Sequence, residues 1–218
     1  LWFYSWADAI APVSQGVAND LKDLAGRPLE RVRVIYNPVV TSDLLALAQE
    51  PVNHPWFVSE APPVIVGVGR LNVQKDFSTL IRAFAKVRQY LPARLMILGE
   101  GEERSQLEAL IGELGLSEEV ALPGFASNPY AFMSKAAVFV LSSAYEGLPT
   151  VLIEAMAVGT SVVSCDCPSG PKEILASGKY GSLVPVGDVQ ALANAIVTAL
   201  KHSTDIKALQ QQAQKFSL

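Results

Sequence analysis

Short runs rich in Val, Ile and Leu alternate with amphipathic segments along most of this 218-residue chain. Within the runs, apolar residues follow one another without polar alternation, which is typical of strands buried on both faces of a parallel sheet. The amphipathic segments between them have the helical spacing that crossover connections require. The sequence therefore predicts an α/β fold with a Rossmann-like, doubly wound parallel sheet.

Hydrophobic periodicity and turn residues set the expected limits of each element. The expected strands cover residues 32–36, 64–68, 94–98, 120–122, 137–141, 161–164 and 182–185. The expected helices cover residues 77–90, 102–114, 128–136, 149–158, 170–176, 188–200 and 205–216. Residues 7–24 are expected to form a short strand and a capped helix. Residues 41–63, with four prolines and little periodicity, are expected to be mostly connection.

Composition narrows the classes of function. The net charge is −4, whereas a general nucleic-acid surface needs a basic excess, so no nucleic-acid partner is expected. No apolar run reaches the roughly 18 residues that span a bilayer, and the apolar start lacks the basic region of a signal peptide. The two cysteines, Cys165 and Cys167, are too few for a zinc site. We expect them to be buried small residues in a reducing, cytoplasmic protein.

Each segment with chemically interesting residues follows an expected strand. In doubly wound sheets, ligands bind outside the carboxyl ends of the strands. We therefore expect these loops to form one crevice at a single edge of the sheet. They cover residues 69–70, 99–101, 123–125, 143–149 and 167–172.

Arg70 and Lys75 are the candidate anion-binding residues. They lie between a strand end and the start of a helix, where two cations suit a diphosphate. Taken alone, the pair is more typical of solvated loop charges, and the accompanying loops reverse that preference. Gly99 and Gly101 form either a tight turn or a place where a ligand approaches the backbone closely. The dinucleotide fingerprint is absent, because no third glycine follows Gly67 and Gly69 at the required spacing.

Glu146 and Glu154 are separated by seven residues that contain the start of a helix. Glu154 lies inside an apolar helix, where a charge needs a partner. Three interpretations stay open: a helix cap with a structural ion pair, a hydrolase dyad, and a pair of acceptors for sugar hydroxyls.

Taken together, these segments resemble glycosyltransferase family 4 (group 1), whose members have the GT-B fold. The segment from Glu146 to Glu154 resembles the Glu-x7-Glu motif of retaining enzymes. Four further motifs occur in the matching order, at residues 11–14, 67–76, 97–101 and 122–125. The resemblance covers most of the chain. It divides the chain into the tail of an N-terminal domain (1–30) and a nucleotide-sugar-binding Rossmann-like domain (31–218).

The resemblance implies a role for each matching residue. Glu146, as the catalytic residue, would contact the transferred sugar, Glu154 would hold the ribose, and Arg70 and Lys75 would bind the diphosphate. The remaining donor-binding residues would be Gly69, Gly99, Glu100, Gly124, Phe125, Gly147, Leu148, Pro149 and Thr150. The implied donor is a nucleotide sugar, often UDP-linked, and neither a cofactor nor a metal is required, because the basic side chains neutralise the leaving diphosphate.

The chain departs from the family pattern at its start, where only the tail of the acceptor-binding domain matches. We therefore expect the donor-binding part of a hexosyl- or N-acetylhexosaminyltransferase, inactive by itself. Its glycan or lipid-linked acceptor would bind the N-terminal domain, which could also attach the whole protein to a membrane. His54 and His202 follow no strand and are expected to be structural or solvated. The alternatives are a non-catalytic nucleotide-sugar-binding or interaction module and, less favoured, an epimerase or phosphorylase of the same fold.

Overall fold

The computed structural model describes residues 7–25 and 32–217 and contains a six-stranded parallel sheet. The strand order is β3-β2-β1-β4-β5-β6, and every neighbouring pair is parallel. The strands are β1 (Val64–Val68), β2 (Arg94–Leu98), β3 (Val120–Gly124), β4 (Val138–Leu141), β5 (Val162–Cys165) and β6 (Ser182–Val184). This order places the point where the connections change direction between β1 and β4, which confirms the predicted doubly wound fold.

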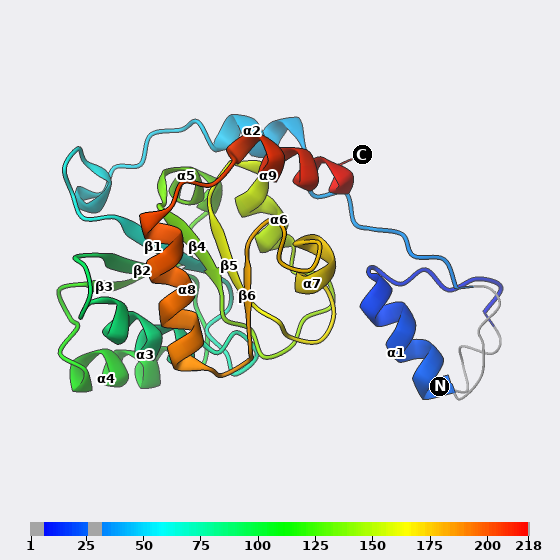
Figure 1. The fold of residues 1–218 in the computed structure, drawn as a ribbon, viewed down its shortest axis with the longest axis horizontal. Helices are drawn as coiled ribbons and strands as arrows, with labels where there is room; N and C mark the ends of the chain where they lie inside the picture. Colours follow the sequence, from blue (N-terminus) through cyan, green and yellow to red (C-terminus); the bar gives the residue numbers. More distant parts are fainter. Residues whose placement is uncertain (1–6, 26–31, 218) are drawn as a thin grey trace.

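Each strand sends alternate side chains into two separate cores. In β1, Ile65 packs with α3 (Phe77–Val87), α4 (Arg104–Glu113) and α8 (Val189–Lys201) on one face. Its neighbours Val64 and Val66 pack on the other face with α6 (Thr150–Ala157), α7 (Pro171–Ile174) and α9 (Ile206–Ala213). Burial on both faces explains why the strands read as continuous apolar runs. Figure 1 shows α8 lying across one face of the sheet.

The structure describes further helices. They are α1 (Gln15–Ala25), α2 (Ser42–Leu47), α5 (Pro129–Lys135) and the 3-10 turns η2 (Pro55–Phe57) and η3 (Gln214–Phe216). Met133 of α5 is buried in the second core with Val66, whereas α1 lies outside both cores. Helix α1 lies apart from the sheet, beyond α7 (Figure 1). Several helices begin at the side chains that the sequence suggested: Asn128, Asp188 and Asp205 each accept a hydrogen bond from a backbone N–H in the first turn.

Two expectations about the first third of the chain were wrong. Residues 32–36 do not form a strand of the sheet: Val32 makes only an isolated bridge to Ile10. The backbone of this run pairs instead with residues 10–12, outside the sheet. Within residues 41–63, the structure has α2, which Thr41 caps by accepting from Leu44 N at 3.2 Å, and also η2. The six-residue α2 is too short to show periodicity, which is why the sequence did not reveal it.

The predicted division at residue 30 falls inside residues 26–31, outside the described part of the chain. It stays a prediction. What the structure shows is that residues 7–25 and 32–40 pair with each other, through Arg33 N to Ile10 O and Ile35 N to Pro12 O, both at 3.0 Å. We refer to residues 7–25 and 32–40 as the N-terminal segment.

Candidate functional site

The loops lie at one edge of the sheet, the carboxyl edge, as the strand pattern predicted, and hydrogen bonds connect them to one another. Backbone hydrogen bonds join neighbouring loops in the order of the strands. They run from Gly99 N to Gly124 O (2.9 Å), Leu71 N to Glu100 O (2.9 Å), Ala144 N to Gln74 O (2.8 Å) and Glu146 N to Pro168 O (3.3 Å). The loops after β1, β2, β3, β4 and β5 therefore hold one another in place.

Lys75 and Glu146 form an ion pair at the centre of this edge, between the ends of β1 and β4. Lys75 Nζ lies 2.6 Å from Glu146 Oε1, and the two side chains are only 16% and 8% exposed. The family resemblance assigned Lys75 to a diphosphate and Glu146 to a sugar. The structural interpretation of the two glutamates expected an ion pair at Glu154. The structure instead joins the two presumed ligand-binding groups directly, at the topological switch point of the sheet.

Three polar side chains around this pair were missed by sequence reasoning. Ser143 Oγ donates to Glu146 Oε1 at 2.7 Å, and Gln74 Nε2 donates to Glu146 Oε2 at 3.4 Å. Ser142 Oγ donates to the carbonyl of Lys75 at 2.7 Å. In the sequence, the two serines directly after an apolar strand, at the edge where ligands bind, could have indicated these contacts. With a cation and two further donors, the Glu146 carboxylate is held in one orientation.

Glu154 lies half-buried on the second turn of α6, four residues after Thr150. Burial raises the pKa of this carboxyl above its ordinary value, while a hydrogen bond from Thr150 and the charge of Lys75 act in the opposite direction. The Lys75 charge therefore acts on both predicted glutamates. A half-buried carboxylate whose loss of solvation is only partly offset by its neighbours is suited to accept hydrogen bonds from hydroxyl groups.

Arg70 and Glu100 lie farther out on the same edge, and each forms an ion pair with another residue. Arg70 Nε lies 3.1 Å from Glu102 Oε2, with the side chains 70% and 56% exposed. Both oxygens of Glu100 accept from Arg104, at 2.7 and 2.8 Å, and this hydrogen bonding lowers the pKa of Glu100. The two predicted residues are thus present at the edge, but neither belongs to the Lys75–Glu146 cluster.

An apolar cavity of about 310 Å³ lies between the ends of β1, β2 and β3. Its walls include the predicted residues Gly69, Arg70, Gly99, Glu100 and Phe125. Phe125 is 81% exposed, so its ring is available to a ligand that enters the cavity. A flat aromatic group would fit such a lining, since aromatic rings favour stacked or edge-on contacts.

The glycines beside this cavity are required by the protein's own backbone. A Cβ on Gly99 would lie 1.9 Å from the carbonyl oxygen of Gly69, and a Cβ on Gly101 would lie 2.2 Å from that of Leu71. The close approach expected of a ligand is therefore made by the neighbouring loop. Gly124 has φ +96, and a Cβ there would lie 2.8 Å from Glu100 Oε1.

Residues 147–150 connect the Glu146 cluster to α6. The carbonyl of Gly147 accepts a hydrogen bond from Ser14 Oγ at 2.8 Å, so this predicted backbone group is engaged by the N-terminal segment. Leu148 is buried in the core beneath the loop. Pro149 is the N-cap residue of α6 and makes no side-chain cap, which leaves the first turn without a capping side chain.

Cys165 and Cys167 are free and buried, as expected. Burial raises the pKa of Cys165 to about 12 and that of Cys167 to about 11, so both stay protonated at neutral pH. Within the described ranges, His, Cys, Asp and Glu form no group of three or more that could hold a metal ion. His54 has a structural role, because its Nδ1 accepts from Trp56 N at 3.2 Å.

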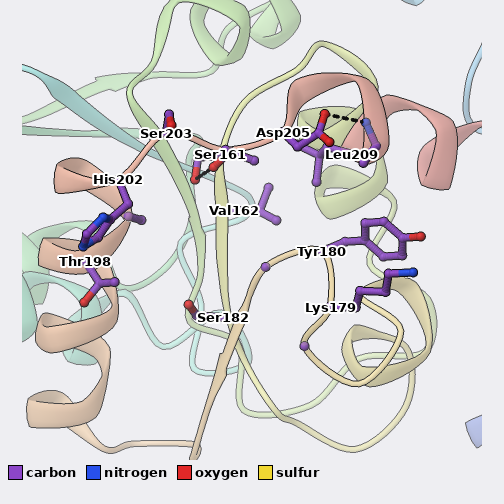
Figure 2. A pocket seen from close by; sticks show the side chains of 15 residues that line it. Ser161, Val162, Lys179, Tyr180, Ser182, Thr198, His202, Ser203, Asp205 and Leu209 are labelled. Atoms are coloured by element: carbon purple, nitrogen blue, oxygen red, sulfur yellow. Dashed lines mark hydrogen bonds between the residues drawn. The ribbon is translucent and has the colours of Figure 1, made fainter.

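A separate cavity of about 450 Å³ lies at the opposite edge, beside the amino ends of β5 and β6 (Figure 2). His202 borders it from the end of α8. Several polar groups of its lining form hydrogen bonds within the protein. Thr204 Oγ1 donates to Ser161 Oγ at 2.9 Å, and Asp205 accepts from the N–H of Ala208 at 3.1 Å. This cavity contains none of the predicted site residues.

The family model for group 1 glycosyl transferases matches residues 52–216 of this chain. The chain belongs to the group 1 glycosyltransferases. The match spans all six strands and all five loops of the carboxyl edge. Transferase activity on glycans is the general function of the homologues found, and the predicted assignment to this group is confirmed at the level of the family model.

Two curated relatives indicate the chemistry of the wider family. The chain is 35% identical over 210 residues to the Campylobacter jejuni N-acetylgalactosamine-N,N'-diacetylbacillosaminyl-diphospho-undecaprenol 4-alpha-N-acetylgalactosaminyltransferase, covering 96% of this chain and 55% of that protein. It is 34% identical over 197 residues to the lipopolysaccharide core biosynthesis glycosyltransferase LpsE of Rhizobium meliloti, covering 90% of this chain and 55% of that protein. The chain thus spans about half the length of the curated relatives it matches.

Solved structures share the fold. Anabaena HepE in complex with UDP superposes with a TM-score of 0.82 at 26% identity, covering 97% of this chain and 60% of that one. The apo form of the lipopolysaccharide outer core galactosyltransferase WaaB gives a TM-score of 0.79 at 26% identity, covering 98% and 59%. The expected GT-B relationship is therefore confirmed.

None of the described helices has the length and hydrophobicity of a membrane span.

Proposed function

We propose that this chain is the donor-binding part of a retaining glycosyltransferase that uses a nucleotide sugar. The observation that carries the proposal is the Lys75–Glu146 pair at the switch point between β1 and β4. A largely buried basic group beside a carboxylate, next to Gly69 at the wall of an apolar cavity, suits a ligand that has a base, a diphosphate and a sugar.

In this proposal each part of the site binds one part of the donor. The apolar cavity beside Phe125 takes the base, and Glu154 accepts hydrogen bonds from the ribose hydroxyls. Lys75 and Arg70 bind the diphosphate, where negative charge grows as the bond to the sugar breaks. Cations placed there stabilise the transition state more than the ground state. Glu146 and the loop 147–150 lie beside the transferred sugar.

Donor binding would change the partners of Lys75. In the structure its ammonium group is engaged by Glu146 at 2.6 Å, so a diphosphate would have to share or replace that contact. Glu146 would keep the hydrogen bond from Ser143 to Oε1. Its other oxygen, Oε2, accepts from Gln74 Nε2 at 3.4 Å and has a second lone pair for a sugar hydroxyl. The pair therefore holds both groups in a defined place before the donor arrives.

The relatives support a proposal for the donor and the acceptor. HepE is described in complex with UDP, and the Campylobacter enzyme transfers N-acetylgalactosamine to a diphospho-undecaprenol-linked glycan, so we propose a UDP-hexose or UDP-N-acetylhexosamine and a glycan or lipid-linked acceptor. We propose that no metal takes part, that the acceptor binds an N-terminal domain, and that this domain provides any membrane association. The two free, buried cysteines suit a cytoplasmic setting.

Calorimetry without added metal tests the proposal. UDP, GDP and ADP are titrated into the chain, with uridine as a control that lacks the diphosphate. We expect binding of at least one nucleoside diphosphate, with at least roughly 10-fold lower affinity for its nucleoside, because charge-assisted contacts contribute about 1.5–3 kcal/mol each. No binding of any of the three at millimolar concentration would overturn the proposal and favour an interaction module with the same fold.

A further inference from the structure

Glu173 makes contacts that the proposed donor site does not use. It lies on α7, and its two carboxylate oxygens accept from the backbone N–H of Gln15 at 2.9 and 3.2 Å. The hydroxyl of Tyr36 also donates to Glu173 Oε1. Gln15 begins α1, and Tyr36 lies on the second part of the N-terminal segment. One carboxylate therefore binds both parts of that segment to the domain.

The contact with Tyr36 is maintained across neutral pH. The hydrogen bond from its hydroxyl to Glu173, together with burial and the carboxylate charge, raises the pKa of Tyr36 to about 12. The tyrosine therefore remains protonated and continues to donate. Its ring also lies edge-on to Phe216, with ring centroids 5.1 Å apart, so the same side chain contacts the end of the chain.

The residue next to Gln15 contacts the loop that carries Glu146. Ser14 is fully buried, and its hydroxyl donates to the carbonyl of Gly147 at 2.8 Å. The same oxygen accepts from Val17 N at 3.2 Å, which fixes it at the start of α1. Gly16 lies so close to the loop after β5 that a Cβ would be 2.6 Å from Ser169 Oγ. A shift of α1 would therefore displace the contact with Gly147.

We propose that Glu173 is a positioning residue for the transferred sugar. By holding Gln15 and Tyr36, it keeps Ser14 against Gly147 and so fixes the loop that follows Glu146. This inference rests on the proposed function, which places that loop beside the sugar. Among the described residues, the Lys75–Glu146 pair and the hydrogen bond from Ala144 N to Gln74 O connect the base and diphosphate parts of the site, at β1 and β2, to the loop that carries Glu146. Loss of Glu173 should therefore weaken recognition of the sugar more than recognition of the nucleotide.

The test compares UDP with four UDP-sugars (those of glucose, galactose, N-acetylglucosamine and N-acetylgalactosamine) by calorimetry on the full chain. The variants are Glu173→Ala, Glu173→Gln and Ser14→Ala, with Glu118→Ala as the control because Glu118 is an exposed carboxylate remote from the site. Amide hydrogen exchange of residues 15–25 is measured on the same samples. This readout reports attachment of α1 independently of any ligand.

For Glu173→Ala we expect a dissociation constant for the tightest-binding UDP-sugar at least about 5-fold higher, and one for UDP within about 2-fold of wild type, as for the loss of one or two hydrogen bonds. Exchange in α1 should rise at the same time. Ser14→Ala should reproduce the change in sugar affinity. Glu173→Gln keeps an acceptor oxygen and should recover part of it, while Glu118→Ala should change neither quantity.

Equal weakening of UDP and UDP-sugar in Glu173→Ala, or no change in either, would overturn the positioning role. Unchanged exchange in α1 would overturn the attachment itself. If Glu173→Ala does not fold, the same ratios in Glu173→Gln and Ser14→Ala decide the question. Wild-type protein that binds neither UDP nor any UDP-sugar would instead overturn the proposed function, and the exchange measurement would still show whether Glu173 holds α1.

Discussion

Two ion pairs at the same edge of the sheet have very different surroundings. Lys75 and Glu146 are 16% and 8% exposed and have further hydrogen-bond partners, whereas Arg70 and Glu102 are 70% and 56% exposed. Exposed pairs contribute about 0–1 kcal/mol, because solvent screens the charges and the long side chains lose entropy. Breaking a shielded pair is far more costly, since one charge is left without a partner. Sequence alone suggested that Arg70 and Lys75 were equivalent, and the structure shows that they are not.

The largest expected effect is on stability. Lys75→Ala leaves the largely buried Glu146 carboxylate without a cation, and we expect a loss of roughly 3 kcal/mol in the free energy of unfolding. Urea denaturation followed by circular dichroism measures it, with Arg70→Ala as the matched control. A loss in Lys75→Ala no greater than that in Arg70→Ala would show that the two pairs do not differ as their burial implies.

Double-mutant cycles compare the two pairs directly. We expect a coupling energy of roughly 2 kcal/mol between Lys75 and Glu146 and at most about 0.5 kcal/mol between Arg70 and Glu102. Each cycle uses alanine at both positions and the same urea assay. Similar coupling energies for the two pairs would contradict the comparison.

Salt should distinguish the two cations in ligand binding. The exposed guanidinium of Arg70 is screened over a Debye length of about 10 Å at 0.1 M salt. We expect Arg70→Ala to weaken UDP binding by roughly 3- to 10-fold at low salt, and by much less at 0.5 M sodium chloride, as for a surface charge. Calorimetry at both salt concentrations checks this, with Arg82→Ala, on the outer part of α3, as a control. An effect of Arg70→Ala that is independent of salt would indicate a shielded contact.

The smallest effect concerns Glu154, whose pKa is raised mainly by burial. Because the folded protein raises the pKa of Glu154, this group contributes its full stability below its ordinary pKa, and that contribution is lost as the pH rises through the folded value. Glu154→Gln should therefore match wild type near pH 4 and melt roughly 1–3 °C higher near pH 8.

Thermal unfolding at both pH values measures the difference, with Glu118→Gln as the control. A melting-temperature gap that does not grow with pH would contradict the direction of the pKa shift. Under the proposed function, the stabilised Glu154→Gln variant should also bind UDP more weakly, because the ribose loses a charged acceptor.

The strands of the sheet could be predicted almost residue by residue. Val64–Val68 and Arg94–Leu98 are bounded as expected, because continuous apolar runs between turn residues have few alternative structures in water. The loops of the site could be placed at the carboxyl edge for the same reason. The failures lie in the first third of the chain: residues 32–36 pair with residues 10–12 outside the sheet, and α2 is too short to have a pattern of its own.

The sequence by itself determined the α/β class, the parallel sheet and the edge that carries the candidate site, since hydrophobic periodicity is local and strand–helix alternation implies parallel strands. The tertiary structure decided which groups meet. Lys75 and Glu146 are 71 positions apart in the chain, and they meet because β1 and β4 are neighbours in the sheet. Gly99 must be glycine because the loop after β1 lies against it. Such contacts depend on the order of the strands in the sheet, which cannot be read from any local stretch of the sequence.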